Sequence, residues 1–300
     1  MPATSPTSSQ PYGVASPGYR LPDATRLGTV HLQVSDLARS VAFYSTVIGL
    51  RVLESTDAVA HMAAHDDARV LLSLHERKGA RPVPPRGRLG LFHVAILLPD
   101  RAALGRFLQH LANLRMQPGM SDHFVSEAIY LSDPDNLGLE IYADRPRAMW
   151  RHDQRQLRMG TVPLDIGEVI DAAGGEPWSG APAGTTIGHV HLHVGDLEQA
   201  SDFYHDLLGL DTMVWGYPGA LFLAAGGYHH HLGTNTWARE AEPALEDEAR
   251  LLEWTIEVPS MSDVDAVEAS LAAGNAVITR DAAGVVSRDP WGTAVRVRAG

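Results

Sequence analysis

Histidines gather at two places in the C-terminal half of this 300-residue chain. Residues 188–194 carry His189, His191 and His193 at alternate positions, so a strand there would present all three on one face. Residues 229–231 are three consecutive histidines. Imidazole is the commonest metal ligand and can transfer protons near neutral pH. Because such side chains are costly to bury without a partner, the pattern indicates metal binding or proton transfer, with an ordinary polar strand as the alternative.

The first histidine segment belongs to an internal repeat. Residues 188–210 align without a gap with residues 28–50, which lie 160 positions earlier. Pro99 and Pro259 are also 160 positions apart, so the repeated unit is longer than this segment. The two copies differ at one informative position, where the first copy has threonine and the second has His189.

The elements that must position these side chains follow a βαβββ pattern. In the first copy, apolar residues alternate over 30–34, as in a strand. Asp36 is placed to cap the N-terminus of a helix that Gly49 would end. Three short strand-like runs follow within residues 52–75. The same order recurs along the chain, which predicts four modules, with a single helix over 196–208 in the third.

The chain divides into four stretches. Residues 1–26 are rich in proline, serine and threonine and predict a disordered or loosely attached tail. Residues 27–143 hold modules one and two, and residues 186–300 hold modules three and four. Residues 144–185 form a long connector between them.

The composition narrows the class of partner. The formal net charge of −12 argues against nucleic acid or an anionic membrane, because both need a basic surface. No apolar run is long enough to span a bilayer. The chain contains no cysteine, which excludes disulfides and thiolate metal sites and fits a cytoplasmic protein. These properties indicate a small-molecule partner and are compatible with a homo-oligomer.

The modules resemble the vicinal oxygen chelate superfamily, which includes glyoxalase I, bleomycin-resistance proteins and extradiol dioxygenases. The resemblance rests on HLxVxDL and the following FY and GL pairs in both copies of the repeat, and on Tyr130, Asp133-Pro134 and Glu140 in module two. It implies an α+β fold in which paired modules form open, barrel-like sheets around a divalent metal.

In this superfamily the metal ligands come from the first and last strands of paired modules. Modules one and two would offer Thr29, His93 and Glu140, whereas modules three and four would offer His189, Glu253 and Arg296. Only a combination of modules two and three gives a clean site, formed by His93, Glu140 and His189. Two imidazoles and one carboxylate suit Fe(II), although Mn(II) or Zn(II) could occupy the same ligands. His191 is the substitute if His189 is not a ligand.

The resemblance also implies catalytic and substrate-binding residues. It places a proton-transferring histidine at His230, with an error of one residue allowed, and a tyrosine that bonds the substrate oxygen at Tyr130. His123 lies upstream of Tyr130, as a second active-site histidine does in the family, but at a shorter spacing. The residues predicted to contact substrate are His229, His231, Asn235 and Trp237.

The sequence therefore predicts an Fe(II)-dependent extradiol dioxygenase of the catechol 2,3-dioxygenase type, acting on a small aromatic diol with O₂. Two alternatives share the fold. A glyoxalase-like isomerase or lyase would typically use a second glutamate ligand. A metal-free, drug-binding protein would need no ligand triad.

Overall fold

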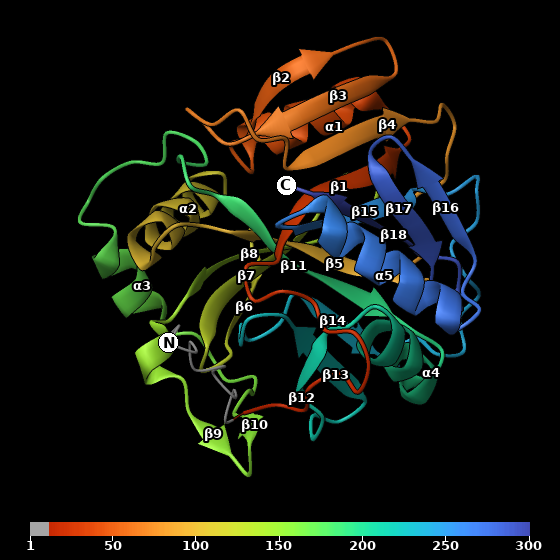
Figure 1. The fold of residues 1–300 in the computed structure, drawn as a ribbon. Coiled ribbons are helices and arrows are strands. Elements are labelled where there is room, and N and C mark those ends of the chain that lie inside the picture. Colours follow the sequence, from red (N-terminus) through yellow and green to blue (C-terminus); the bar gives the residue numbers. More distant parts are fainter. Residues whose placement is uncertain (1–11) are drawn as a thin grey trace, which may run out of the picture.

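The computed structural model describes residues 12–300, and Figure 1 shows four βαβββ modules with a connector. Module one comprises β1 (Arg26–Val34), α1 (Leu37–Thr46), β2 (Arg51–Ser55), β3 (Val59–Ala63) and β4 (Leu72–Glu76). Module two comprises β5 (Gly90–Leu97), α2 (Arg101–Asn113), β6 (Gly119–Asp122), β7 (Ser126–Ser132) and β8 (Gly138–Asp144). The predicted α+β fold is confirmed.

The second half repeats this order after the connector. The connector holds a short 3₁₀ turn η1 (Arg147–Met149), β9 (His152–Asp153), β10 (Gln156–Leu157) and α3 (Ile166–Ala172). Module three comprises β11 (Thr186–His193), α4 (Leu197–Ser201), the π-helix η2 (Asp202–Leu207), β12 (Asp211–Val214), β13 (Ala220–Ala224) and β14 (Leu232–Asn235). Module four comprises β15 (Arg250–Val258), α5 (Met261–Ala273), β16 (Ile278–Asp281), β17 (Gly284–Arg288) and β18 (Ala294–Ala299).

Modules pair across the sequence repeat, not within it. One eight-stranded sheet has the order β12-β13-β14-β11-β5-β8-β7-β6, so it joins module three to module two. The other has the order β16-β17-β18-β15-β1-β4-β3-β2 and joins module four to module one. In Figure 1, β5 and β11 lie side by side in the middle of the first sheet, where they pair antiparallel. The strand order confirms the combination of modules two and three on which the predicted ligand triad depends.

The helices begin where the sequence predicts. The side chains of Asp36 and Asp196 accept hydrogen bonds from the backbone N–H groups of Arg39 and Gln199, so both copies of the repeat use the same N-cap. The predicted helix over 196–208 is wound as α4 and then as the π-helix η2. No helix within residues 12–300 combines the length and apolar character needed to cross a membrane.

Buried tyrosine–aspartate contacts join consecutive modules. The hydroxyl of Tyr44 donates to Asp133, and that of Tyr204 donates to Asp289 at 2.9 Å. Both tyrosines are fully buried. These bonds connect module one to two and module three to four, whereas the sheets connect two to three and one to four. The two sheets are therefore tied together through their cores.

The described part of the tail contacts the rest of the protein. The described part of residues 1–26 packs on module three, where Val14 pairs with Thr212, Leu21 is buried, and Arg20 forms an ion pair with Asp211. Residues 12–25 therefore contact module three through the backbone pairing of Val14 with β12 and through the Arg20–Asp211 ion pair. Residues 1–11 lie outside the described part of the chain.

Candidate metal centre and active site

Three side chains converge on the concave face of the first sheet. His93 lies on β5, Glu140 on the parallel neighbour β8, and His189 on the antiparallel neighbour β11. Ala95 is the register partner of both Glu140 and His189, and His93 is two residues away on the same face. The methyl side chain of Ala95 leaves space between the three larger groups.

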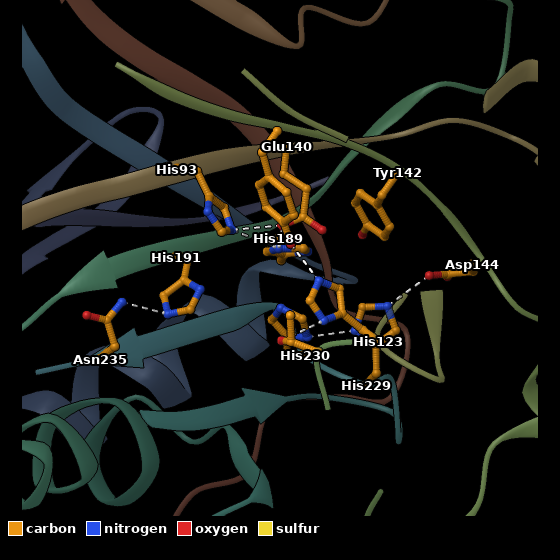
Figure 2. A network of polar contacts seen from close by, with 12 residues as sticks. His93, His123, Glu140, Tyr142, Asp144, His189, His191, His229, His230 and Asn235 are labelled. Carbon is orange, nitrogen blue, oxygen red and sulfur yellow. Dashed lines mark hydrogen bonds and ion pairs between the residues drawn. The ribbon is translucent and has the colours of Figure 1, made fainter. Parts of the chain in front are cut away.

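The ligand atoms of these residues meet at short distances. Oε2 of Glu140 lies 2.9 Å from Nε2 of His93 and 3.1 Å from Nε2 of His189, and the two nitrogens are 3.3 Å apart (Figure 2). All three residues are at most 5% exposed. A buried carboxylate needs a compensating positive charge, which a divalent cation between these atoms would provide. The donor set and its convergence therefore fit a metal ion.

The ionisation of the triad also suits metal binding. Burial lowers the pKa of His189 to about 4, so its imidazole is neutral at pH 7. Burial alone would raise the pKa of Glu140, but its contacts with His189 and His93 hold this pKa well below the usual range. The site thus offers a neutral nitrogen donor and an ionised carboxylate at neutral pH.

His191 is held away from the triad. Its Nε2 accepts a hydrogen bond from Nδ2 of Asn235 at 2.9 Å, and the amide oxygen of Asn235 bonds Nδ1 of His193 at 2.7 Å. Within residues 12–300, the group of side chains able to hold a metal includes His189 and not His191. The structure therefore places His189, the preferred residue, beside the other two.

The second sheet has no such triad at the corresponding positions. Arg296 forms an ion pair with Glu253, with 2.6 Å between Nε and Oε1. Thr29 donates its hydroxyl proton to the backbone oxygen of Val70. The guanidinium group of Arg296 occupies the place beside Glu253 that a metal cation would fill. The candidate metal site is therefore in the first sheet.

Tyr130 and His123 form a hydrogen-bonded pair beside the triad. Tyr130 on β7 is the register partner of Glu140, and its hydroxyl lies 2.6 Å from Nε2 of His123. Nδ1 of His123 lies 2.7 Å from the backbone oxygen of Gly160, which can only accept, so Nδ1 carries the proton and Nε2 accepts from Tyr130. Burial, together with the charge of Glu140, raises the pKa of Tyr130 well above 10.

A second hydrogen-bonded chain leads through the consecutive histidines. Oδ1 of Asp144 lies 2.8 Å from Nε2 of His229, and Nδ1 of His229 lies 2.7 Å from Nδ1 of His230 (Figure 2). The His230 ring contacts that of His189, with 4.0 Å between centroids. Burial lowers the pKa of His230 well below 6.5.

A cavity of about 280 Å³ connects these groups. Besides the triad it is lined by five predicted or substitute residues, His123, Tyr130, His191, His230 and Trp237. The other lining residues are Phe92, Ser121, Met159, Gly160, Thr161, Tyr217 and Phe222.

Three predicted substrate-binding residues, His229, His231 and Asn235, do not line this cavity. His229 is directed toward Asp144, and Nδ1 of His231 accepts from the backbone N–H of Ala225. Asn235 orients two neighbouring histidines. All three are buried behind the cavity wall and can act only through the residues that they contact.

The sequence analysis missed the wall formed by the connector and by the loop after β12. Residues 159–161 and Tyr217 close this side, and the hydroxyls of Thr161 and Tyr217 lie 2.9 Å apart. Strand β6, which carries Ser121, was also missed because its residues show no apolar alternation. A Gly-Thr pair in a connector gives no signal of its own, whereas the aromatic Phe92 directly before His93 could have been noticed.

Comparison with known proteins supports this description of the fold. The model of the glyoxalase/bleomycin resistance protein/dioxygenase superfamily matches residues 26–141 and 186–296. Catechol-2,3-dioxygenase of Bacillus subtilis (strain 168) is 46% identical over 247 residues, which cover 81% of this chain and 86% of that protein.

Two crystal structures show the same fold at low identity. A candidate dioxygenase of Bacillus subtilis superposes with a TM-score of 0.61 at 13% identity, covering 94% of this chain and 86% of that one. Glyoxalase I of Zea mays superposes with a TM-score of 0.54 at 16% identity, covering 92% of each chain. With both halves of the sequence matched and a relative of 46% identity, the chain belongs to the glyoxalase/bleomycin resistance protein/dioxygenase superfamily.

Proposed function

We propose that this protein is an Fe(II)-dependent extradiol dioxygenase that cleaves a catechol-type aromatic diol with O₂. The observation that carries the proposal is the convergence of His93, Glu140 and His189 at the cavity. A site of two histidines and one carboxylate leaves coordination positions open, which suits Fe(II) and O₂ chemistry. The name of the Bacillus relative, Catechol-2,3-dioxygenase, supports the class of substrate.

Fe(II) held by these three residues would supply a Lewis acid with open positions and a one-electron donor. The rest of the cavity would bind the ring and exclude water. The rings of Phe92 and Trp237 meet edge to face, with centroids 5.5 Å apart, and Phe222 contributes a further apolar surface. Such rings suit a flat aromatic substrate.

His230 is the proposed proton acceptor. If Nε2 of His229 donates to Asp144, then Nδ1 of His229 has the lone pair and accepts from Nδ1–H of His230. Nε2 of His230 is then unprotonated and can take a proton from a diol hydroxyl. Asp144 and His229 thus act as positioning residues that select the tautomer of His230.

Tyr130 is proposed to orient the diol. Its proton points to Nε2 of His123, so its oxygen has a lone pair available for a substrate hydroxyl. His123 can in turn hold a proton at Nε2. This arrangement gives a second route by which a proton can leave the diol without entering solvent.

Purification in the absence of oxygen, followed by metal analysis, tests the proposal. We expect about one iron per chain, catechol-dependent O₂ uptake, and a product that contains both atoms of ¹⁸O₂. Tightly held zinc with no O₂ uptake would point to an isomerase of the same fold, and no bound metal at all would point to a binding protein. A His93→Ala variant should lose the metal, and full retention would contradict the assignment of the ligands.

Cytoplasmic location and assembly into a homo-oligomer stay predictions. The cytoplasmic location is based on the absence of cysteine, and the homo-oligomer is only compatible with the sequence. Size-exclusion chromatography with light scattering would establish the oligomeric state.

A further inference from the structure

A basic hollow borders the wall of the candidate active-site cavity. Its volume is about 270 Å³, and it is lined by Asp122, Phe124, Arg145, Met149, Arg151 and Arg158. None of these residues lines the candidate active-site cavity, although His123 and Met159, which do, are direct neighbours of three of them in the chain. We call this hollow the arginine pocket. It is a separate pocket that adjoins the same two segments.

Part of the arginine pocket is electrically balanced. Residues 145–158 contain five arginines and a single acidic residue, although the formal net charge of the whole protein is −12. Nη2 of Arg145 lies 2.7 Å from Asp122 and 3.0 Å from Glu127, and Glu127 also forms an ion pair with Arg101. These two arginines and two carboxylates compensate one another. Any unbalanced charge in the lining must therefore come from the other arginines.

Arg151 and Arg158 lie opposite each other at the end of the hairpin formed by β9 and β10 (Figure 1). The backbone N–H of Arg158 donates to the backbone oxygen of Arg151 at 2.8 Å. Like charges directly opposite each other on neighbouring strands are destabilising. No carboxylate within residues 12–300 forms an ion pair with either side chain. This pair therefore gives the pocket two positive charges without a counter-charge.

The Arg158 side chain is oriented by the ring of Phe124. Its guanidinium carbon lies 5.2 Å from the ring centroid, a distance at which cation–π attraction holds the group over the ring. Phe124 has a φ of 69°, which a bulky residue seldom adopts, and its backbone N–H donates to the Asp122 side chain at 2.7 Å. A cation that is oriented in advance loses less freedom when it binds an anion.

We propose that the arginine pocket binds a small divalent oxyanion, either a phosphate group or a dicarboxylate. A divalent anion matches the two uncompensated charges of Arg151 and Arg158. The planar guanidinium group presents paired N–H donors that fit the oxygen atoms of phosphate and carboxylate alike. The volume of the pocket accommodates such an anion together with water. This site is additional to the proposed ring cleavage, because it shares no lining residue with the cavity that would hold the diol.

Titration calorimetry on the full-length, metal-loaded protein tests the pocket. The probes are inorganic phosphate and succinate, at an ionic strength held constant with sodium chloride, because salt screens exposed charges. We expect one of the two anions to bind with a Kd of about 1 mM or lower. Tighter binding of phosphate would identify a phosphate site, and tighter binding of succinate a dicarboxylate site. No saturable binding of either anion would overturn the proposal.

Substitution of the two arginines locates the binding. Arg151→Gln and Arg158→Gln each remove one charge at an exposed position, and each should raise the Kd at least about tenfold because charge-assisted hydrogen bonds are lost. The double variant should show no saturable binding. Arg239→Gln, at another exposed arginine, is the matched control and should keep the original Kd. An unchanged Kd in the double variant would place the anion elsewhere, for example at the metal, and would contradict the proposal.

Thermal unfolding provides a second measurement. Without added anion, each single substitution should leave the Tm unchanged or raise it, because it relieves the contact between like charges. The anion that binds should raise the Tm of the original protein but not that of the double variant. A rise of equal size in both proteins would show that the anion acts outside the arginine pocket, and would contradict the site.

Discussion

Asp144 and His229 form a hydrogen bond of 2.8 Å at the rear of the cavity, and His229 is in turn hydrogen-bonded to His230. The carboxylate side chain is 26% exposed, whereas the His229 ring is fully buried. The hydrogen bond to the Asp144 carboxylate oxygen selects which nitrogen of each histidine carries the proton. The orientation of a reactive imidazole therefore depends on a residue outside the cavity.

We expect Asp144→Asn to lower kcat on the order of 100-fold, because the amide can donate to Nε2 of His229 and reverse both tautomers. The iron content should stay unchanged, and the pH profile of kcat should shift. Steady-state kinetics and metal analysis check both points. Asp153→Asn, at an exposed position on β9, is the control. Normal kcat in Asp144→Asn would exclude the positioning role.

Ala95 gives a prediction about metal binding. Leucine at this position would extend into the space between Glu140 and His189, so the iron content should fall from about one per chain to near zero. Overpacking of a buried position also costs about 1–3 kcal/mol. Thr255→Leu, at the equivalent buried position of the other sheet, should cost similar stability without loss of iron. Metal analysis and urea unfolding separate the two effects, and full iron content in Ala95→Leu would contradict the site.

Tyr130 and His123 should act as one unit. Tyr130→Phe and His123→Ala are each expected to lower kcat by about 10–100-fold. The double variant should lose little more than either single variant, because each substitution already breaks the 2.6 Å contact. Kinetics of the four proteins form the test. Additive losses would show that the two residues act independently.

The Tyr44–Asp133 contact predicts a pH-dependent effect on stability. Burial, opposed by hydrogen bonds, raises the pKa of Asp133 to about 6 in the folded protein, above 3.8. The stabilising contribution of Asp133 is therefore present below about pH 4 and is lost as the pH rises through 6. The tyrosine hydroxyl bonds the ionised carboxylate more strongly, so it offsets part of this loss.

Tyr44→Phe should consequently lower the free energy of unfolding more at pH 7.5 than at pH 4.5, by about 1–3 kcal/mol at the higher pH. Urea unfolding of both proteins at the two pH values provides the measurement. Tyr204→Phe should behave alike, because burial also raises the pKa of Asp289. An equal loss at both pH values would contradict this account.

Much of the fold follows from local sequence signals. The N-cap aspartates, the alternating strands and the repeat at a fixed offset each specify an element without reference to the rest of the chain. The chemical mismatch between Thr29 and His189 also indicated which modules had to share a site. The strand order confirmed that pairing.

Side-chain direction outside regular strands could not be predicted in the same way. Residues 228–231 are irregular, so no periodicity indicates that His230 faces the cavity while His229 and His231 face Asp144 and Ala225. The closing wall from residues 159–161 depends on how the connector returns to β6, where Val162 pairs with Asp122. Such long-range packing leaves no local pattern in the sequence.

The exchange of partners between modules affects what each half of the chain could do alone. Residues 27–143 contain β1 and β5 but lack their antiparallel partners β15 and β11. A polypeptide cut in the connector would therefore expose two unpaired central edges on each fragment, and these edges are complementary. The two halves of the chain exchange modules in the way that the subunits of a domain-swapped dimer do. We expect co-expressed halves to reassemble into the complete fold, and either half alone to self-associate.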